Sequence, residues 1–503
     1  MPETELKFVL DDTSAALLQT GIAALEGAAP AVRHALHAIY FDTRGHRLKK
    51  AGVALRIRRE DGRWVQTLKA RADNGTGLQR AEEAEIALET PELDLEAIPD
   101  KALRKLVRGL VGDRTLRPVC ETVMERLTVL VRPADGTVVE VSLDQGRIIA
   151  GAAEVPFLEL ELELKSGPVA ALYDLAGALL GDGRMTPSRL SKSARGYLLA
   201  ATGQIAPPAA PRKAADVALD PGMSAGQAGR AIFAEIAAQV LDNIDAVLAG
   251  DDPEGPHQLR VGLRRLRAAL VLFSKPAGGE AADRLASEAR WLGGMVGTQR
   301  DLDVAADLLV GPAIAASGPG APPDEVLRRI GARAAANRPD LRDTLAGLRA
   351  KRFALDLARF AETAPWDAMK TPARQVATAA LGKSWRRAER RAQGIATLNL
   401  DERHDLRKAL KRVRYQTEFA APLYDPAAVE AFLGPLKAVQ DAFGALNDIA
   451  MLETLLRGDD GPGDAGVLRD LLALRQADAP DLWAQAQTLW AELDRAPRFW
   501  QAG

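Results

Sequence analysis

Hydrophobic and polar residues alternate with a period of two in several runs between residues 3 and 164. The first run places Glu3, Glu5 and Lys7 on one face of an extended chain and three mainly apolar residues on the other face. The run 158–164 repeats the pattern, with leucine at every second position and glutamate between the leucines. This period is typical of β-strands that bury one face, so we expect a strand-rich N-terminal region.

Turn signals separate these runs and indicate hairpins between antiparallel strands. They are pairs or triplets ending in glycine, at Asp61-Gly62, Asp73-Asn74-Gly75, Asp135-Gly136 and Gln145-Gly146. Apolar residues at three-to-four spacing predict helices over residues 92–112 and 168–182. The N-terminal domain is therefore expected to be α+β with a dominant antiparallel sheet.

Charges of one sign dominate whole runs. Basic side chains alternate with apolar ones over residues 54–58, whereas acidic side chains do so over residues 158–164. A single strand with a solvated face gives the same alternation, and an open sheet is an alternative. Acidic strands alternating with basic strands are more typical of a closed barrel, in which the charged faces line the lumen. We therefore expect a barrel with a charged interior.

The pattern changes after the first domain, which we place at residues 1–202. Residues 203–224 include a Pro- and Ala-rich stretch without apolar periodicity, which is typical of an extended linker. Over residues 225–503, Ala, Leu, Arg and Glu recur at helical spacing, with breaks at 311–323 and 458–464. The second domain is therefore expected to be an all-α helical bundle.

Two segments of the helical region match each other, at residues 257–267 and 404–414. The first, fourth, eighth and eleventh positions of each segment are basic and fall on one stripe of an α-helix; they are His257, Arg260, Arg264 and Arg267, and His404, Arg407, Lys411 and Arg414. A glycine and an aspartate follow each segment at corresponding offsets, as Gly297 and Asp301 and as Gly444 and Asp448. The match predicts two related half-bundles that present cationic ridges to a shared groove.

Like charges at this spacing repel each other, so the two stripes indicate an anionic ligand. A solvated basic face explains one such helix, but two matching copies favour a binding surface. Long-chain polyphosphate fits better than nucleic acid, because the region offers few aromatic residues for base stacking. The two histidines are weaker candidates for metal binding, since no close Cys or His pair accompanies either helix.

The composition limits the remaining function classes. The 503 residues carry a formal net charge of −2, so no overall field draws the protein to nucleic acid. The single cysteine, Cys120, excludes an intrachain disulfide and indicates a reducing compartment. No apolar run has the length of a membrane span, and the first residues do not resemble a targeting segment. We expect a cytoplasmic protein without a membrane or nucleic-acid partner.

An ordered series of motifs in the first domain resembles the CYTH family, the triphosphate tunnel metalloenzymes. The series is Glu3-x-Glu5-x-Lys7, Tyr40-Phe41-Asp42-Thr43, Ala54-Leu55-Arg56-Ile57-Arg58, Leu143-Asp144-Gln145-Gly146, the run 159–165 and Ser191-Lys192. The helical region resembles the CHAD family, and the tandem order is similar to bacterial inorganic triphosphatases of this class. The resemblance implies an eight-stranded antiparallel tunnel, metal-dependent hydrolysis of inorganic triphosphate and polyphosphate binding by the helices.

The resemblance also implies roles for the charged residues of the tunnel. The cations that would hold phosphate oxygens are Arg56, Arg58, Lys69, Arg126 and Lys192. The carboxylates that would bind Mg²⁺ or Mn²⁺ are Glu3, Glu5, Glu161 and Glu163, with Asp144 and Glu159 as further candidates. The catalytic candidates are Lys7, as a point charge beside the first-strand acids, and Glu83 and Glu85, as groups that orient water or partner the basic side chains.

Several alternatives stay open at this stage. Glu82 rather than Glu83 could face the lumen, because the strand fits two registers, and Asp144 could be a turn residue instead of a ligand. His46 lies in a turn-like segment and is expected to be an exposed loop residue. The tunnel could act on an organic triphosphate, as thiamine triphosphatases and adenylate cyclases of this family do, although the few aromatic residues favour the inorganic substrate. The non-enzymatic alternative is a polyphosphate-binding scaffold associated with polyphosphate granules.

Overall fold

The computed structural model describes residues 3–501 except 74–75, 134, 182–184, 207–208, 274–276, 307–322, 457–472 and 474–475. The chain forms two compact units. The first unit combines residues 1–209 with residues 347–363, and the second combines residues 210–346 with residues 364–503. The sequence placed 347–363 in the helical domain, whereas in the structure this segment packs with the strand-rich unit.

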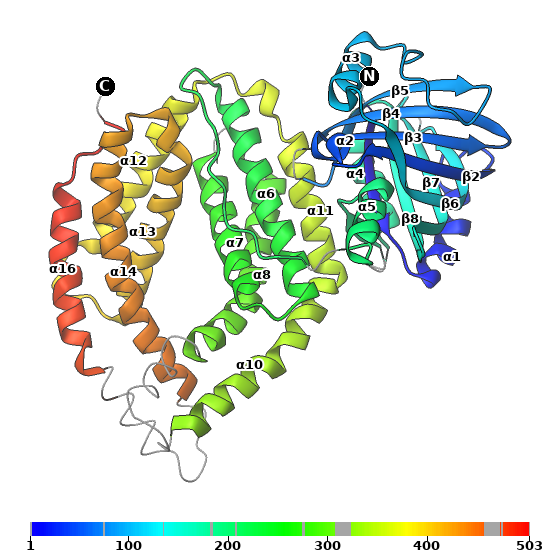
Figure 1. The fold of residues 1–503 in the computed structure, drawn as a ribbon. Helices are drawn as coiled ribbons and strands as arrows, with labels where there is room; N and C mark the ends of the chain where they lie inside the picture. The colour runs from blue at the N-terminus through cyan, green and yellow to red at the C-terminus, as the bar shows by residue number, and fades with distance from the viewer. Residues whose placement is uncertain are drawn as a thin grey trace. The chain divides into compact units, whose positions relative to one another are not determined.

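Eight antiparallel strands of the first unit form a closed barrel, as expected (Figure 1). They are β1 (Glu3–Val9), β2 (Val32–Thr43), β3 (Val53–Glu60), β4 (Arg63–Asp73), β5 (Gln79–Leu88), β6 (Leu116–Val131), β7 (Val138–Ala150) and β8 (Ala153–Ser166). The order is β5-β4-β3-β2-β6-β7-β8-β1, and β1 pairs back with β5 to close the barrel. A short strand, β9 (Thr186–Ser188), is added beside β1.

Two of the predicted turns are confirmed and one is wrong. Asp61 and Gly62 join β3 to β4, both with positive φ, and Asp135-Gly136 lies between β6 and β7. Gln145-Gly146, by contrast, lies inside β7, which continues to Ala150. A Cβ at Gly146 would come within 2.3 Å of the carbonyl oxygen of Val123, so this glycine permits close strand contact rather than a turn. Asn74 and Gly75 lie outside the described residues.

Six helices accompany the barrel: α1 (Asp12–Gly21), α2 (Arg47–Lys50), α3 (Lys101–Val111), α4 (Ala170–Leu179), α5 (Lys192–Thr202) and α11 (Leu348–Thr363). The predicted helix 92–112 is shorter in the structure, because the Asp100 side chain accepts a hydrogen bond from the Leu103 amide and caps the start of α3. The predicted helix 168–182 corresponds to α4. His46 is exposed at the start of α2, as expected.

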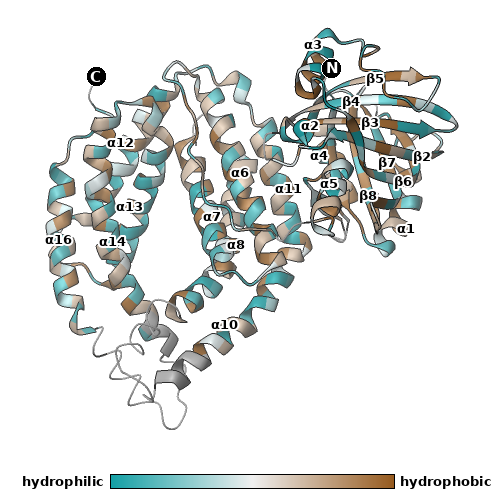
Figure 2. Ribbon diagram, in the orientation of Figure 1, coloured by the Kyte–Doolittle hydropathy of each residue, from teal (hydrophilic) through white to brown (hydrophobic). Residues whose placement is uncertain are grey.

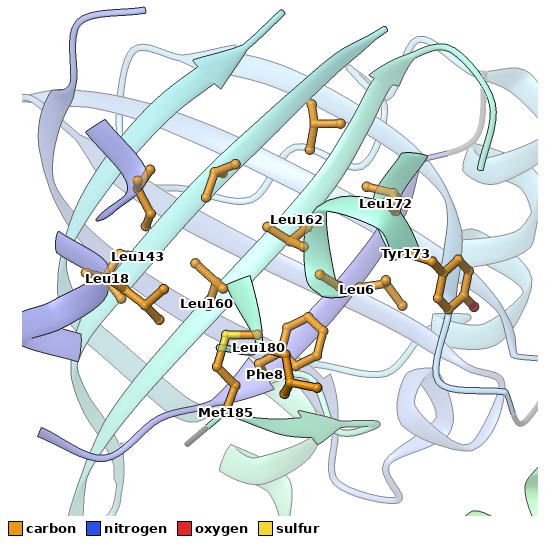
Figure 3. Packing of buried hydrophobic residues seen from close by; sticks show 14 of the residues in the cluster. Leu6, Phe8, Leu18, Leu143, Leu160, Leu162, Leu172, Tyr173, Leu180 and Met185 are labelled. Carbon is orange, nitrogen blue, oxygen red and sulfur yellow. The ribbon is translucent and has the colours of Figure 1, made fainter. Parts of the chain in front are cut away.

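The outer face of the barrel packs against helices. Leu6, Phe8, Leu160 and Leu162 point outward from β1 and β8 and are almost fully buried (Figure 3). They join residues of α4, including Tyr173, in one apolar cluster. Burying each such side chain stabilises the fold by about 1.5–3 kcal/mol. The alternate residues of the same strands are thereby directed into the lumen.

Helix α5 closes an apolar cluster on the inner side of the barrel. Leu199 of α5 packs with Tyr40 of β2 and Met124 of β6, both of which also line the charged cavity described below. Gly196 allows this close approach, since a Cβ there would lie 2.3 Å from the Sγ atom of Cys120. This packing places Lys192, the first residue of α5, in the lumen.

The second unit is helical, with two related groups of three helices. The first group is α6 (Ala225–Ala249), α7 (Glu254–Leu272) and α8 (Glu280–Val304); the second is α12 (Ala373–Ala392), α13 (Leu400–Ala420) and α14 (Pro426–Leu456). Each helix of the second group starts 146 to 148 residues after its counterpart, at 373, 400 and 426 against 225, 254 and 280. These starts support the predicted relation between the two halves. Helices α10 (Pro323–Ala346) and α16 (Ala479–Arg495) complete the described part of this unit.

The predicted core faces of the repeat helices are confirmed. Leu259, Leu263 and Leu266 of α7 are buried, as are Leu406 and Leu410 of α13. Hydrophobic and hydrophilic residues are interspersed along the helices (Figure 2). Among the described residues, no helix combines the length and hydropathy needed to cross a bilayer.

Candidate functional site: a charged tunnel and a cationic groove

The barrel encloses a cavity of about 360 Å³ with a strongly charged lining. Most of the residues selected from the sequence contribute to it: Glu3, Glu5, Lys7, Arg56, Arg58, Lys69, Glu83, Glu85, Arg126, Glu161, Glu163 and Lys192. They come from β1, β3, β4, β5, β6, β8 and the start of α5, so strands distant in sequence converge on one lumen. The structure thus brings the two signs of charge together in one enclosed space.

Glu161 is the centre of a buried ion-pair network. It contacts the Lys7 and Lys192 amines, the latter at 2.8 Å, and the Arg126 guanidinium at 2.5 Å. Burial alone would raise the pKa of Glu161, but Lys192, Lys7 and Arg126 together hold it well below its usual value. Lys7 also contacts Glu5 at 2.7 Å. The three cations therefore stabilise the charged form of Glu161, which contacts all of them.

Asp144 and Glu159 are fully buried and do not line the cavity. Asp144 lies in the middle of β7, opposite Arg126, so it is a strand residue rather than a turn residue. It accepts two 2.7 Å hydrogen bonds from Arg126 and contacts Lys192 at 2.7 Å. Glu159 contacts Lys192 and Arg195, the latter at 2.6 Å. Both carboxylates therefore hold these cations from buried positions inside the barrel.

The register of β5 is settled by its partner strand. Glu83 faces Lys69 across the β4–β5 pair, with 3.2 Å between the amine and the carboxylate, and it lines the cavity. The preceding residue, Glu82, is exposed and is not part of the lining. Ala84, the next residue, is buried in an outer cluster with α3. The assignment of Glu83 to the lumen is thus confirmed over Glu82.

Two arginines of β3 have unsatisfied donors. The Nε atoms of Arg56 and Arg58 are buried and have no hydrogen-bond partner among the described residues. Burial and the nearby charge of Arg56 lower the pKa of Arg58, although Glu60 and Glu85 lie 2.9 and 3.5 Å away. A buried guanidinium whose Nε donor has no partner can take an anion, and its fork geometry suits phosphate oxygens.

Some carboxylates of the lumen lie close enough to raise one another's pKa values. Burial, with Glu3 and Glu85 nearby, raises the pKa of Glu83, although Lys69 opposes the shift. Burial, with Glu3 and Glu140 nearby, likewise raises the pKa of Glu163, against the effect of Lys165. Negative charge is therefore incompletely balanced at these two positions, so an added cation would stabilise the charged forms.

The donor set of the tunnel suits a hard divalent cation, which prefers carboxylate oxygens. Among the described residues, one group places three carboxylate oxygens within 4.8 Å of one another, and it consists of Asp144, Glu159 and Glu161. Lys192 already contacts all three of these carboxylates. A cation at this triad would compete with that amine, whereas carboxylates at the cavity surface are less fully neutralised.

Sequence reasoning missed Arg195 as a member of the network. Arg195 is buried and donates a 2.9 Å hydrogen bond to Ser188 in addition to contacting Glu159. It lies three residues after Lys192 on α5, so the helical period alone would have placed both cations on one face. Lys165, which contacts Glu163 at 2.7 Å, and Thr67 also line the cavity.

The helical unit contains a second cavity, of about 480 Å³, lined by both of its related halves. Six of the eight predicted stripe residues line it: His257, Arg260, Arg264, His404, Arg407 and Lys411. Arg267 and Arg414 are not part of the lining, and Arg414 pairs with Glu418 at 2.7 Å instead. Asp301 and Asp448, the predicted matching acids, line the cavity from α8 and α14. We call this cavity the cationic groove.

The two related halves of the helical unit place different residue types at some corresponding positions of the cationic groove. Arg300 and Asn447, which the sequence reasoning missed, each precede the matching aspartate by one residue. Asp301 contacts Arg260 at 2.6 Å. Burial lowers the pKa of Lys411 to about 6, with Arg264 and Arg407 adding repulsion. The groove is therefore short of negative charge and favours an anionic ligand.

Two family models match the sequence, that of the CYTH domain over residues 1–197 and that of the CHAD domain over residues 231–457. The chain combines a CYTH domain with a CHAD domain. The tunnel lies in the CYTH domain, and the cationic groove lies in the CHAD domain.

Individual proteins resemble each part. The inorganic triphosphatase of Haemophilus influenzae is 37% identical over 161 residues, a stretch that covers 32% of this chain and 44%, less than half, of that protein. An uncharacterized protein of Mycobacterium tuberculosis is 26% identical over 530 residues, covering 99% of this chain and 97% of its own. The crystal structure of the CHAD domain from the plant Ricinus communis matches with a TM-score of 0.51 and 27% identity, over 57% of this chain and 98% of that domain.

Proposed function

We propose that the CYTH domain hydrolyses inorganic triphosphate to diphosphate and phosphate with the help of Mg²⁺ or Mn²⁺. The observation that carries the proposal is the enclosed lumen, in which buried arginines with free donors face incompletely neutralised carboxylates. The resemblance of the CYTH region to an inorganic triphosphatase supports the same reaction class. Eight glutamates line the tunnel among the described residues, against two aspartates in the cationic groove, and so many carboxylates would oppose anion binding without a bound cation, which argues against a scaffold without activity.

In this proposal the cations of the lumen bind and orient the substrate. Arg56 and Arg58 would take phosphate oxygens with their free Nε donors, and Lys69, Arg126 and Lys192 would add positive charge. Phosphoryl transfer depends mainly on positioning and on stabilising the charge that develops on the phosphate oxygens. Because Glu161, Asp144 and Glu159 fix several of these cations beforehand, little reorganisation is needed when the substrate binds.

The metal ligands in this proposal are carboxylates at the cavity surface. Glu3, Glu5, Glu161 and Glu163 line the lumen, and Asp144 and Glu159 stay candidates through their closeness to Glu161. A bound divalent cation would neutralise charge on the phosphate chain. Glu83 and Glu85 would orient the attacking water, and Lys7 would contribute a positive charge beside Glu5.

The lining favours an inorganic substrate over a nucleotide or thiamine triphosphate. Tyr40 is the one Phe, Tyr or Trp among the described residues of the lining, and its hydroxyl interacts with Arg56. Stacking of an organic ring needs an accessible aromatic face, but Tyr40 is buried in the apolar cluster under α5. The tunnel therefore presents cationic side chains that can bind phosphate groups, but few side chains that could bind an organic ring.

We further propose that the cationic groove of the CHAD domain binds long-chain polyphosphate. Four fixed or potential cations, Arg260, Arg264, Arg407 and Lys411, face one cavity from both halves of the domain. A chain of phosphates would relieve the repulsion between them and satisfy the buried Nε donor of Arg407. Replacing these four residues with alanine is expected to abolish retention on immobilised polyphosphate; unchanged retention would remove the groove as the binding surface.

A substrate panel tests the proposed reaction. Phosphate release from tripolyphosphate, ATP, thiamine triphosphate and long-chain polyphosphate is measured at matched Mg²⁺ and Mn²⁺ concentrations, with a metal-free control. We expect metal-dependent release that is fastest from tripolyphosphate, and loss of most of this activity in Glu5→Gln. Absence of release from every substrate would favour the scaffold, and full activity of Glu5→Gln would remove the metal assignment of that residue.

Polyphosphate binding is expected to take up a proton on Lys411. The folded pKa near 6 lies below the ordinary value of 10.5, so Lys411 is mostly neutral in the free protein between these values and becomes charged beside a polyanion. Affinity should therefore fall as the pH rises from 6 to 9. The other charged groups that face the groove are Arg260, Arg264, His257, Arg300, Asp301, His404, Arg407 and Asp448.

Calorimetry in two buffers of different ionisation enthalpy measures this uptake at pH 8. The pKa values of both groove histidines are lowered by burial, so they contribute less than Lys411 at this pH. Lys411→Met should remove most of the uptake, whereas Lys408→Met, which changes an exposed lysine of the same helix, should leave it unchanged. Equal uptake by wild type and Lys411→Met would contradict the prediction.

A further inference from the structure

Helix α11 belongs to the CHAD match by sequence but packs within the tunnel unit. Leu355 and Ala358 of α11 join the apolar cluster that includes Tyr173 of α4 and the outer face of the barrel. Arg359 also pairs with Asp174 of α4 at 2.7 Å, on the exposed side of the contact. The helical part of the chain therefore supplies a structural element to the barrel.

Glu362, near the end of α11, makes a buried polar contact between this helix and the barrel. Its side chain is 7% exposed, accepts a 2.6 Å hydrogen bond from the Thr76 hydroxyl and lies 2.9 Å from the Arg80 guanidinium. Thr76 is fully buried, and Arg80 is the second residue of β5. A buried carboxylate held by charge-assisted bonds fixes the geometry of both partners.

The start of β5 is also where the barrel closes. The β1–β5 pairing consists of three residue pairs, in which Glu3 lies opposite Ala81, Thr4 opposite Arg80 and Glu5 opposite Gln79. The pairing of β1 with β8 begins only at Glu5. Among the described strand pairings, the backbone of Glu3 therefore pairs with β5 alone, while its side chain also contacts Lys69 of β4 at 2.7 Å.

We propose that α11 is a positioning element of the tunnel, in which Glu362 anchors the start of β5 and thereby holds Glu3 and Glu5 in the lumen. This inference rests on the proposed function of the two carboxylates as metal ligands. It follows that the hydrolytic activity of the CYTH domain depends on a side chain from the CHAD region. Removing Glu362 would leave Arg80 without this buried partner. The β1–β5 pairing, which we call the closing seam, would therefore loosen before the other strand pairings of the barrel.

Two measurements on the full chain test the inference in the variants Glu362→Ala and Glu362→Gln: backbone amide hydrogen exchange, and the Mg²⁺ dependence of tripolyphosphate hydrolysis. Without metal or substrate, Glu362→Ala should speed amide exchange in β1 and at the start of β5 about tenfold or more, and should leave β6 and β7 unchanged. The Mg²⁺ concentration for half-maximal hydrolysis should rise by about the same factor. Glu362→Gln, which still accepts from Thr76, should recover part of both effects.

Arg359→Ala is the matched control, because it removes an exposed ion pair of the same helix without touching β5. It should behave like wild type in both measurements. A lower unfolding temperature in Glu362→Ala with wild-type exchange in β1 and a wild-type Mg²⁺ requirement would overturn the inference. If Glu362→Ala does not fold, Thr76→Val removes the hydrogen bond between the Thr76 hydroxyl and Glu362 and is judged by the same criteria. Inactive wild type would refute the proposed function, while the exchange result would still decide whether Glu362 fixes the seam.

Discussion

Glu161→Gln is expected to abolish hydrolysis and to destabilise the tunnel strongly. The change removes the carboxylate that contacts Lys7, Arg126 and Lys192 and leaves buried positive charge uncompensated. Breaking a buried ion pair in this way costs about 3–5 kcal/mol, which lowers the unfolding temperature of a domain of this size by roughly 6–20 °C. Misplaced cations should reduce kcat by at least about 100-fold. Calorimetry and phosphate release from tripolyphosphate, assayed well below the unfolding transition, measure the two effects.

Glu154→Gln is the matched control for this prediction. Glu154 lies on the same strand, β8, and pairs with Arg147 at 3.3 Å, but both side chains are about half exposed. An exposed pair contributes about 0–1 kcal/mol, so this variant should resemble wild type in stability and activity. Wild-type kcat in Glu161→Gln would show that the network is not needed for catalysis.

Arg58→Met is expected to reduce kcat/KM about 100- to 1000-fold without destabilising the protein. Arg58 has a free buried donor for a phosphate oxygen, so its loss removes stabilisation of the substrate and of the transition state. Burial and Arg56 lower its pKa, while ion pairs with Glu60 at 2.9 Å and Glu85 at 3.5 Å oppose that shift. Because these effects offset each other, the unfolding temperature of the free variant should change little, in contrast to Glu161→Gln.

Two further variants define this second prediction. Arg58→Lys keeps the charge but loses the planar fork, so it should recover only part of the activity. Arg59→Met changes the next residue, which is exposed and stacks on Trp64, and should leave kcat/KM unchanged. A strong loss of stability in Arg58→Met would instead assign this arginine a structural role.

The period-two pattern predicted the barrel and most of its lining because side-chain direction in a strand depends only on residue parity. A buried outer face fixes that parity, as Leu6 and Phe8 do for β1. The local signals were less dependable. Gln145-Gly146 resembles a turn in its residue types, but Gly146 is needed because the backbone of β6 passes close to it. That close approach cannot be inferred from the neighbouring residues in the sequence. The helical period could have placed Arg195 beside Lys192, but its partner Glu159, 36 residues away in the chain, could not be inferred from local sequence.

The helical repeat predicted the groove but overestimated its length. Ten residues of helix rise about 15 Å, so the last cation of each stripe lies far from the histidine at its start. The cavity reaches His257 and Arg264 but not Arg267, which lies near Arg290 and has its pKa lowered by burial. The sequence shows which residues share one face of a helix. How far along that face the cavity extends depends on how neighbouring helices pack against it.

The two matching segments of the CHAD domain carry different cations at one equivalent position of the cationic groove. Arg264 and Lys411 occupy equivalent positions, seven residues after the matching histidines. Burial lowers the pKa of Arg264 to about 10, which leaves the guanidinium charged at neutral pH, whereas burial and the neighbouring arginines lower the pKa of Lys411 to about 6. For the proposed polyphosphate site, arginine in both places would supply the same charge across the neutral range, whereas this pair supplies one constant charge and a second that is complete only in acid.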